Sequence, residues 1–158
     1  MNKKLAKSLR LVIIILGVLG LLVYADVIPW SLLTFTQQYP EFSGWFIPWL
    51  IFLLVTAVPL YVILALGIKV SKKIESDNSF TSENVKSLKG VSLCLIIDAA
   101  YFLIGNIILW ALNMNYLGIV AASAILCAFV VCIAVAVKIL AVLVEKAVEM
   151  REENESYI

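Results

Sequence analysis

KVSKKIESDNSFTSENVKSLKG, residues 69–90, is the one long hydrophilic stretch between the two ends of this chain. It divides four apolar segments into two pairs, and it carries five of the twelve lysines and arginines in the sequence. The charge of this stretch therefore largely decides on which side of a membrane the two pairs are joined.

The apolar content of the chain exceeds what a soluble domain of its size can bury. Of its 158 residues 63% are hydrophobic, and the mean hydropathy is +1.05. Soluble proteins contain about 45–50% apolar residues, and small domains bury only part of their surface. A helix of about 20 residues spans the hydrocarbon core of a bilayer. The sequence therefore predicts an all-α integral membrane protein, a four-transmembrane-helix bundle that forms a single domain over residues 1–158, with spans at 9–28, 45–68, 91–112 and 116–144.

Lysine and arginine are confined to three parts of the sequence. All twelve lie in residues 1–10, in residues 69–90 or from Lys138 onward, and the connections at 25–44 and 113–115 have none. Basic residues are retained on the cytoplasmic side of a membrane. We therefore expect two in–out–in hairpins with both termini and the loop 69–90 in the cytoplasm, an extracytoplasmic loop at 25–44, and an acidic cytoplasmic tail at 145–158. Within this tail we expect the last helix to continue through residues 145–149 and residues 151–158 to be solvated and frayed.

The first apolar segment has a second interpretation as a cleaved signal peptide. It follows a basic start, and Val23-Tyr24-Ala25 resembles a small-residue cleavage site. Three further spans follow it, however, and the run is close to a full bilayer width. We favour an uncleaved span, and the signal peptide stays the alternative.

The second connection and the second span contain irregular features. Aromatic residues between 24 and 49 favour a belt at the membrane boundary over a ligand-binding lid. Pro29 is placed to start a short helix that lies on the membrane surface. Pro59 lies in the middle of the second span and predicts a kink, where Thr56 is placed to satisfy the freed carbonyls.

The second half of the charged stretch reads as the start of a helix. Thr81 is a good N-cap residue, and Phe80 and Val85 have the spacing of a hydrophobic staple. This pattern fits a capped start of the third span and equally a docking surface for a partner. The candidate partner-binding residues are Phe80, Thr81, Glu83, Asn84, Lys86, Leu88 and Lys89.

Polar residues inside the spans are the second group of candidates: Asp98, Tyr101, Asn106 and Lys138. An acid at mid-membrane costs about 2.5–3.5 kcal/mol on insertion scales, so Asp98 should face the bundle interior or a wet cavity. The alternative is a structural Asp98, hydrogen-bonded to a tyrosine or asparagine or paired with Lys138, although Lys138 lies closer to the membrane surface.

Small residues recur every four positions in the last span, at Ala124, Ala128, Cys132 and Ala136. This spacing allows close helix packing in lipid. The three cysteines form no CxxC pair, so we expect them to be buried small side chains and not a disulfide framework.

Several functions are disfavoured by composition. The chain has no histidine and shows neither GxSxG nor HExxH, so we expect no enzyme, no metal site and no cofactor. The net charge of +1 argues against direct nucleic-acid binding.

The pattern Phe-Thr-x-Glu-Asn-x-x-x-Leu-Lys at residues 80–89 resembles a bacterial family of small four-span membrane proteins known as domain of unknown function 2975. The resemblance implies a location in the bacterial cytoplasmic membrane and a gene often next to a small helix-turn-helix regulator of the Cro/CI type. It supplies no catalytic residues.

Two functions of different classes follow. The first is a regulatory or sensory partner of a cytosolic protein, with a transcription regulator as one candidate. The second is a small transporter or channel subunit that uses Asp98 and works as a homo-oligomer, because four spans make a thin pore wall.

Overall fold

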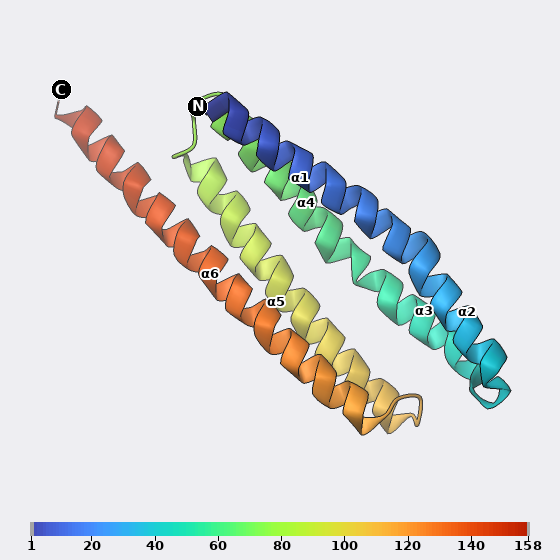
Figure 1. Ribbon diagram of the computed structural model, residues 1–158. Helices are drawn as coiled ribbons and strands as arrows, with labels where there is room; N and C mark the ends of the chain where they lie inside the picture. The colour runs from blue at the N-terminus through green and yellow to red at the C-terminus, as the bar shows by residue number, and fades with distance from the viewer. Residues whose placement is uncertain (1, 158) are drawn as a thin grey trace.

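The computed structural model describes residues 2–157, and all of its regular elements are helical (Figure 1). Four continuous or nearly continuous helical segments are long and apolar enough to cross a membrane: Asn2–Gln38, Pro40–Glu75, Ser82–Ala111 and Leu117–Ser156. The expected all-α, four-span architecture is therefore confirmed. The chain is a multi-pass membrane protein.

The first segment is longer than predicted. It consists of α1 (Asn2–Leu22), a π-helical turn (Val23–Val27) and α2 (Ile28–Gln38). Pro29 cannot donate to the carbonyl four residues back. The wider π turn accommodates this, with the N–H of Ile28 bonding the carbonyl of Val23. The prediction of a loop at 25–44 is therefore wrong for residues 25–38, which are helical. Pro29 lies in the first turn of α2, as expected for a proline that starts a helix, but the π turn joins α2 to α1, so α2 is not a separate surface helix.

The second segment is interrupted close to Pro59. A 3-10 helix (Pro40–Trp45) leads into α3 (Phe46–Val55), and α4 (Ala57–Glu75) follows after a break at Thr56. Pro59 has no N–H for the carbonyl of Val55. The N–H of Thr56 bonds the carbonyl of Leu53, and its hydroxyl donates to the same carbonyl at 2.6 Å. The break lies three residues before Pro59, next to Val55, whose carbonyl the proline ring would clash with in a regular helix.

The charged stretch is mostly helical. α4 continues to Glu75 and α5 (Ser82–Ala111) begins after residues 76–81, so the connection between them is short. The Thr81 hydroxyl accepts the backbone N–H of Asn84 at 3.3 Å, which confirms the predicted N-cap. The expected loop at 69–90 is thus reduced to a tight turn between two long helices.

α6 (Leu117–Ser156) is the longest helix, and its last turns extend past the other helices in Figure 1. The expected continuation of this helix through residues 145–149 is confirmed. Residues 151–158 were expected to be frayed, but α6 is helical through Ser156. The charged and the aromatic residues gather at opposite ends of the molecule. The charged end comprises residues 2–10, 69–89 and 138–156, and the aromatic end comprises residues 30–49 and 113–117.

Each helical segment packs mainly on its neighbour in sequence: α1 on α4, α4 on α5 and, most extensively, α5 on α6. Two bonds fix the last pair, from Ser92 Oγ to the Ala134 carbonyl at 2.7 Å and from Cys127 Sγ to the Ala99 carbonyl at 3.3 Å. The buried face of α6 is formed by Ser123, Cys127, Ala134 and Ala141.

The predicted packing residues Ala124, Ala128, Cys132 and Ala136 are all exposed, so they do not belong to the buried face of α6. The buried face is rotated by one residue, about 100° around the helix. A four-residue spacing could not show this, because it occurs on more than one face of α6. Of the cysteines, Cys127 is buried as expected, whereas Cys94 is half-buried and Cys132 is exposed.

Two buried asparagines hold the turn between α5 and α6. Asn106 is fully buried, and Asn115 donates from Nδ2 to the Asn106 side-chain oxygen at 2.9 Å. The Asn115 oxygen accepts the N–H of Tyr116 at 2.8 Å. Asn106 therefore has a structural role at the aromatic end.

We expect Asn115→Ala to lower the free energy of unfolding by about 1–3 kcal/mol, because it leaves the Asn106 oxygen buried without a donor. Unfolding by SDS in mixed micelles measures this. Asn78→Ala, at an exposed asparagine in the other hairpin turn, is the control and should change stability little. Equal stability of the two variants would contradict the role assigned to Asn115.

Candidate functional site

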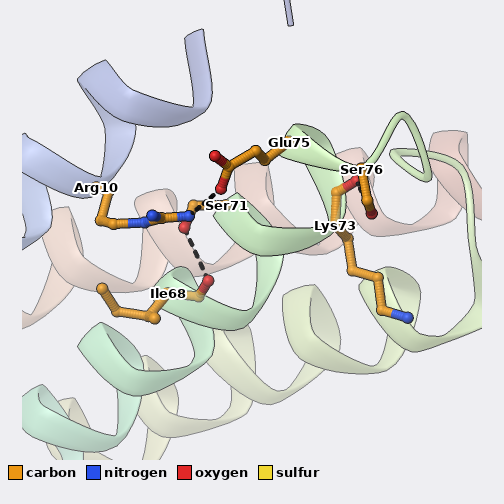
Figure 2. A network of polar contacts seen from close by, with 6 residues as sticks. All are labelled: Arg10, Ile68, Ser71, Lys73, Glu75 and Ser76. Carbon is orange, nitrogen blue, oxygen red and sulfur yellow. Dashed lines mark hydrogen bonds and ion pairs between the residues drawn. The ribbon is translucent and has the colours of Figure 1, made fainter. Parts of the chain in front are cut away.

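Charged side chains connect the helices at the charged end. Arg10 reaches across from α1 to Glu75 at 2.6 Å, and Figure 2 shows the Lys73 side chain pointing away from this pair. Lys73 pairs instead with Glu83 on α5 at 2.8 Å. Lys89 on α5 pairs with Glu145 on α6 at 3.1 Å. All four helical segments are thus linked at this end by charge.

The predicted partner-binding residues divide into two groups. Asn84 is buried, and its side chain donates to the Ser79 carbonyl at 2.8 Å, so it is not available to a partner. Thr81 and Leu88 are half-buried. Phe80, Glu83, Lys86 and Lys89 are exposed, and Glu83 and Lys89 are engaged in ion pairs. Phe80 is the notable member, because 53% of this large apolar side chain is accessible.

The Arg10–Glu75 pair predicts that stability depends on pH. The hydrogen bond from Arg10, and then its charge, lower the pKa of Glu75 below the ordinary value of 4.5. Such a carboxyl group stabilises the fold above its unfolded pKa, and this contribution is lost as the pH falls through the folded pKa. We expect Glu75→Gln to lower the melting temperature in detergent at pH 7 and to flatten its decline below pH 4.5. A Glu75→Gln variant whose melting temperature declines below pH 4.5 as steeply as that of the unmodified protein would contradict this role of the pair.

A second group of polar residues lies near the middle of the bundle. This mid-height cluster comprises Tyr24, Thr56, Asp98 and Tyr101. The Tyr24 and Thr56 hydroxyls lie 2.8 Å apart, which joins the π turn of the first segment to the break in the second. Tyr101 donates to the carbonyl of Phe52 at 3.0 Å. This carbonyl is the one that Thr56 would have bonded in a regular helix, so Tyr101 from α5 satisfies a group freed by the break.

Asp98 is the unusual member of the mid-height cluster. One carboxylate oxygen, Oδ1, is buried and has no hydrogen-bond partner within residues 2–157. Asp98 and Thr56 line a small cavity of about 190 Å³ with residues of α5 and α6, among them Cys127. A carboxylate oxygen that is buried without a donor is energetically costly. The arrangement can accept a proton or a donor-bearing ligand at Oδ1.

The hydrogen bonds and the ion pair expected for a structural Asp98 are not found among the described residues. Tyr101 bonds Phe52, and Asn106 bonds Asn115. Lys138 is exposed and lines a separate depression beside Lys89. Among the described residues, none of the three proposed partners bonds Asp98.

Sequence reasoning missed Tyr24 and Phe52 as contributors to this site. Pro29 and Pro59 are the sequence features that could have indicated this site, because each proline frees a backbone carbonyl that a hydroxyl group can bond. Nothing in the sequence indicates that the two irregular points lie side by side. Across residues 2–157 no group of three or more His, Cys, Asp or Glu side chains is placed to hold a metal ion.

A family model described as "Protein of unknown function (DUF2975)" matches residues 30–158. The chain belongs to the DUF2975 family. The match begins within α2 and includes the aromatic end, residues 69–89 and 138–156 of the charged end, and the mid-height residues Thr56, Asp98 and Tyr101. No curated protein and no solved structure matches the chain. The family assignment therefore confirms the resemblance carried by residues 80–89 and brings no activity with it.

Proposed function

We propose that this DUF2975 protein is a regulatory or sensory membrane protein whose charged end faces the cytoplasm and docks a cytosolic protein. The observation that carries the proposal is Phe80, a large apolar side chain that is 53% exposed on the tight turn between α4 and α5. A partly exposed aromatic anchor on a rigid element is typical of interaction hot spots.

The turn that presents Phe80 is held in place on both sides. The Thr81 cap and the bond from Asn84 to the Ser79 carbonyl fix the backbone next to Phe80. Phe80 also lines a groove of about 290 Å³ that reaches Leu5 on α1 and Leu140 on α6. A preorganised aromatic residue beside an apolar groove lowers the entropic cost of binding a partner.

The end of α6 adds a second contact surface. All residues from Glu149 to Tyr157 are exposed, and Met150 is 61% exposed among acidic neighbours. Most of the stability of a helix in a protein comes from tertiary packing. A partner that covers this helix would supply such packing. The family resemblance makes a small helix-turn-helix regulator the first partner to test.

Photo-crosslinking in native membranes tests the proposal. A photo-reactive residue at Ser82, which is exposed beside Phe80, should capture one defined soluble protein. Phe80→Ala should reduce this capture by at least about tenfold, as expected for removal of an aromatic hot spot. Tyr39→Ala, an exposed aromatic residue at the other end, is the control and should leave capture unchanged. Capture that is insensitive to Phe80 would contradict the proposal.

The second candidate function is transport of protons or cations by an oligomer, and the unpartnered Oδ1 of Asp98 favours it. In this function Asp98 binds and releases the transported ion in the cavity beside Thr56. Asp98→Asn keeps the size of the side chain and removes the charge. Flux into proteoliposomes should be abolished in this variant, and flux that survives would exclude Asp98 as the carrier.

A further inference from the structure

A second cavity at the charged end is lined mainly by lysines. It measures about 510 Å³ and lies between α4 and the first turns of α5. Four lysines line it, Lys69, Lys72, Lys73 and Lys86, against a single acid, Glu83. Phe80 is not among its lining residues, and the cavity shares one lining residue, Asn84, with the proposed docking groove.

We propose that this cavity binds the phosphate headgroup of an anionic phospholipid. A basic pocket between membrane helices at the surface of the bilayer is a recognised type of lipid headgroup site. The proposal goes beyond the docking function and does not depend on it, because it requires only that the charged end lies at a membrane surface.

The arrangement of the charges supports an anion in this cavity. Lys69, Lys72 and Lys73 have the spacing i, i+3 and i+4, which places them on one side of α4. Glu83 is already engaged by Lys73 at 2.8 Å. The pKa of Glu83 is lowered first by this bond to Lys73 and further by the charges of Lys69 and Lys86, so these lysines approach the same point.

The other three lysines that line the cavity have no carboxylate partner within residues 2–157. Lys69, Lys72 and Lys86 make no ion pair within residues 2–157, and all three are exposed. The start of α5 adds the partial positive charge of a helix N-terminus to the same cavity. An uncompensated group of three ammonium ions is thus available to a phosphate.

The surface below the lysines identifies the ligand as a lipid and not a free anion. On α4, Lys69 and Lys72 continue a helical stripe whose deeper residues, Val58 and Val62, are exposed and apolar. On α5, Lys86 heads a stripe that continues with Leu93 and Ile97, which are exposed as well. Both stripes are basic at the membrane surface and apolar below it. This division matches a phosphate headgroup above acyl chains.

Native mass spectrometry of the full chain in neutral detergent micelles tests the proposal, with equal amounts of dioleoyl phosphatidylglycerol and dioleoyl phosphatidylcholine added. We expect phosphatidylglycerol to be retained in preference to phosphatidylcholine. The variant Lys69→Gln/Lys72→Gln/Lys86→Gln should reduce this retention by at least about tenfold. The matching arginine variant keeps the charge at the same three positions and should retain the lipid.

The control removes the same charge from the same end of the molecule. Lys3→Gln/Lys4→Gln/Lys7→Gln changes three exposed lysines on α1 that do not line the cavity, and it should leave lipid retention unchanged. Equal loss in both glutamine variants would show a diffuse charge effect and overturn the proposal.

A second arm distinguishes a lipid from a free anion. Inorganic phosphate is added to delipidated protein, and its ³¹P line width is followed. We expect no broadening. Broadening that is lost in the Lys69→Gln/Lys72→Gln/Lys86→Gln variant would assign the cavity to a free anion and overturn the lipid assignment.

Discussion

Replacing Gly105 with alanine is expected to lower the free energy of unfolding by about 1–3 kcal/mol, as overpacking of a closely packed core does. A Cβ at residue 105 would lie 2.8 Å from Phe52 Cδ2 and 2.9 Å from Cζ, and it would lie closer still to Cε2. The Phe52 ring has little room to move, because it stacks on Phe102 with a centroid separation of 5.6 Å and meets Trp49 edge-on at 5.7 Å. The glycine is therefore required where α5 meets the second segment.

Gly118→Ala is the matched control for this substitution. It is the same chemical change in a helix, and a Cβ there would meet nothing within 4 Å. Because alanine favours helix over glycine, we expect this variant to be neutral or more stable by up to about 1 kcal/mol. SDS-induced unfolding in mixed micelles compares the two. A Gly105→Ala variant as stable as Gly118→Ala would contradict the packing of Phe52 on α5.

Replacing Asp98 with leucine is expected to raise the free energy of unfolding by about 1–3 kcal/mol. Removing the Asp98 carboxylate breaks no hydrogen bond of Oδ1 within residues 2–157. The side chain also lines a cavity with room for an apolar replacement. Most core substitutions destabilise, so a gain would mark Asp98 as a residue that the protein keeps at a cost to stability. Such a cost is typical of functional positions.

Ser92→Ala provides the contrast on the same helix. The Ser92 hydroxyl is buried and donates to the Ala134 carbonyl at 2.7 Å, so its loss should cost about 1 kcal/mol. Both variants are measured by the same unfolding assay. A loss of stability in Asp98→Leu comparable to that in Ser92→Ala would mean that Asp98 is structural, and it would remove the support for the transport function.

Composition and charge predicted the architecture but not the ends of its helices. The four apolar runs correspond to the four helical segments, since apolar length is a direct consequence of bilayer thickness. The prediction of a loop at 25–44 was wrong for residues 25–38, because the π turn allows the helical segment to continue past Pro29. The frayed end predicted at 151–158 was wrong, because residues 151–156 continue an existing helix, for which nucleation is already complete.

The candidate sites were only partly predictable. The Thr81 cap is local, and local chemistry is readable in sequence. The contacts Tyr24–Thr56 and Tyr101–Phe52 join residues 32 and 49 positions apart, and they depend on how the helices are rotated. The same rotation made the small-residue stripe misleading, since Ala134 and Ala141 face α5 whereas Ala128 and Ala136 do not. Helix rotation is set by the sum of all packing contacts and not by one spacing.

The orientation of the charged end is the claim on which the docking proposal depends most directly, and cysteine labelling in intact cells tests it. Cys94, Cys127 and Cys132 are first replaced by serine or alanine, and single cysteines are then placed at exposed positions in the two ends, Ser43 and Ser82. We predict that a membrane-impermeant maleimide labels the cysteine at residue 43 in intact cells and the cysteine at residue 82 only after lysis. Labelling of residue 82 in intact cells would place Phe80 outside the cell and contradict the docking of a cytosolic partner.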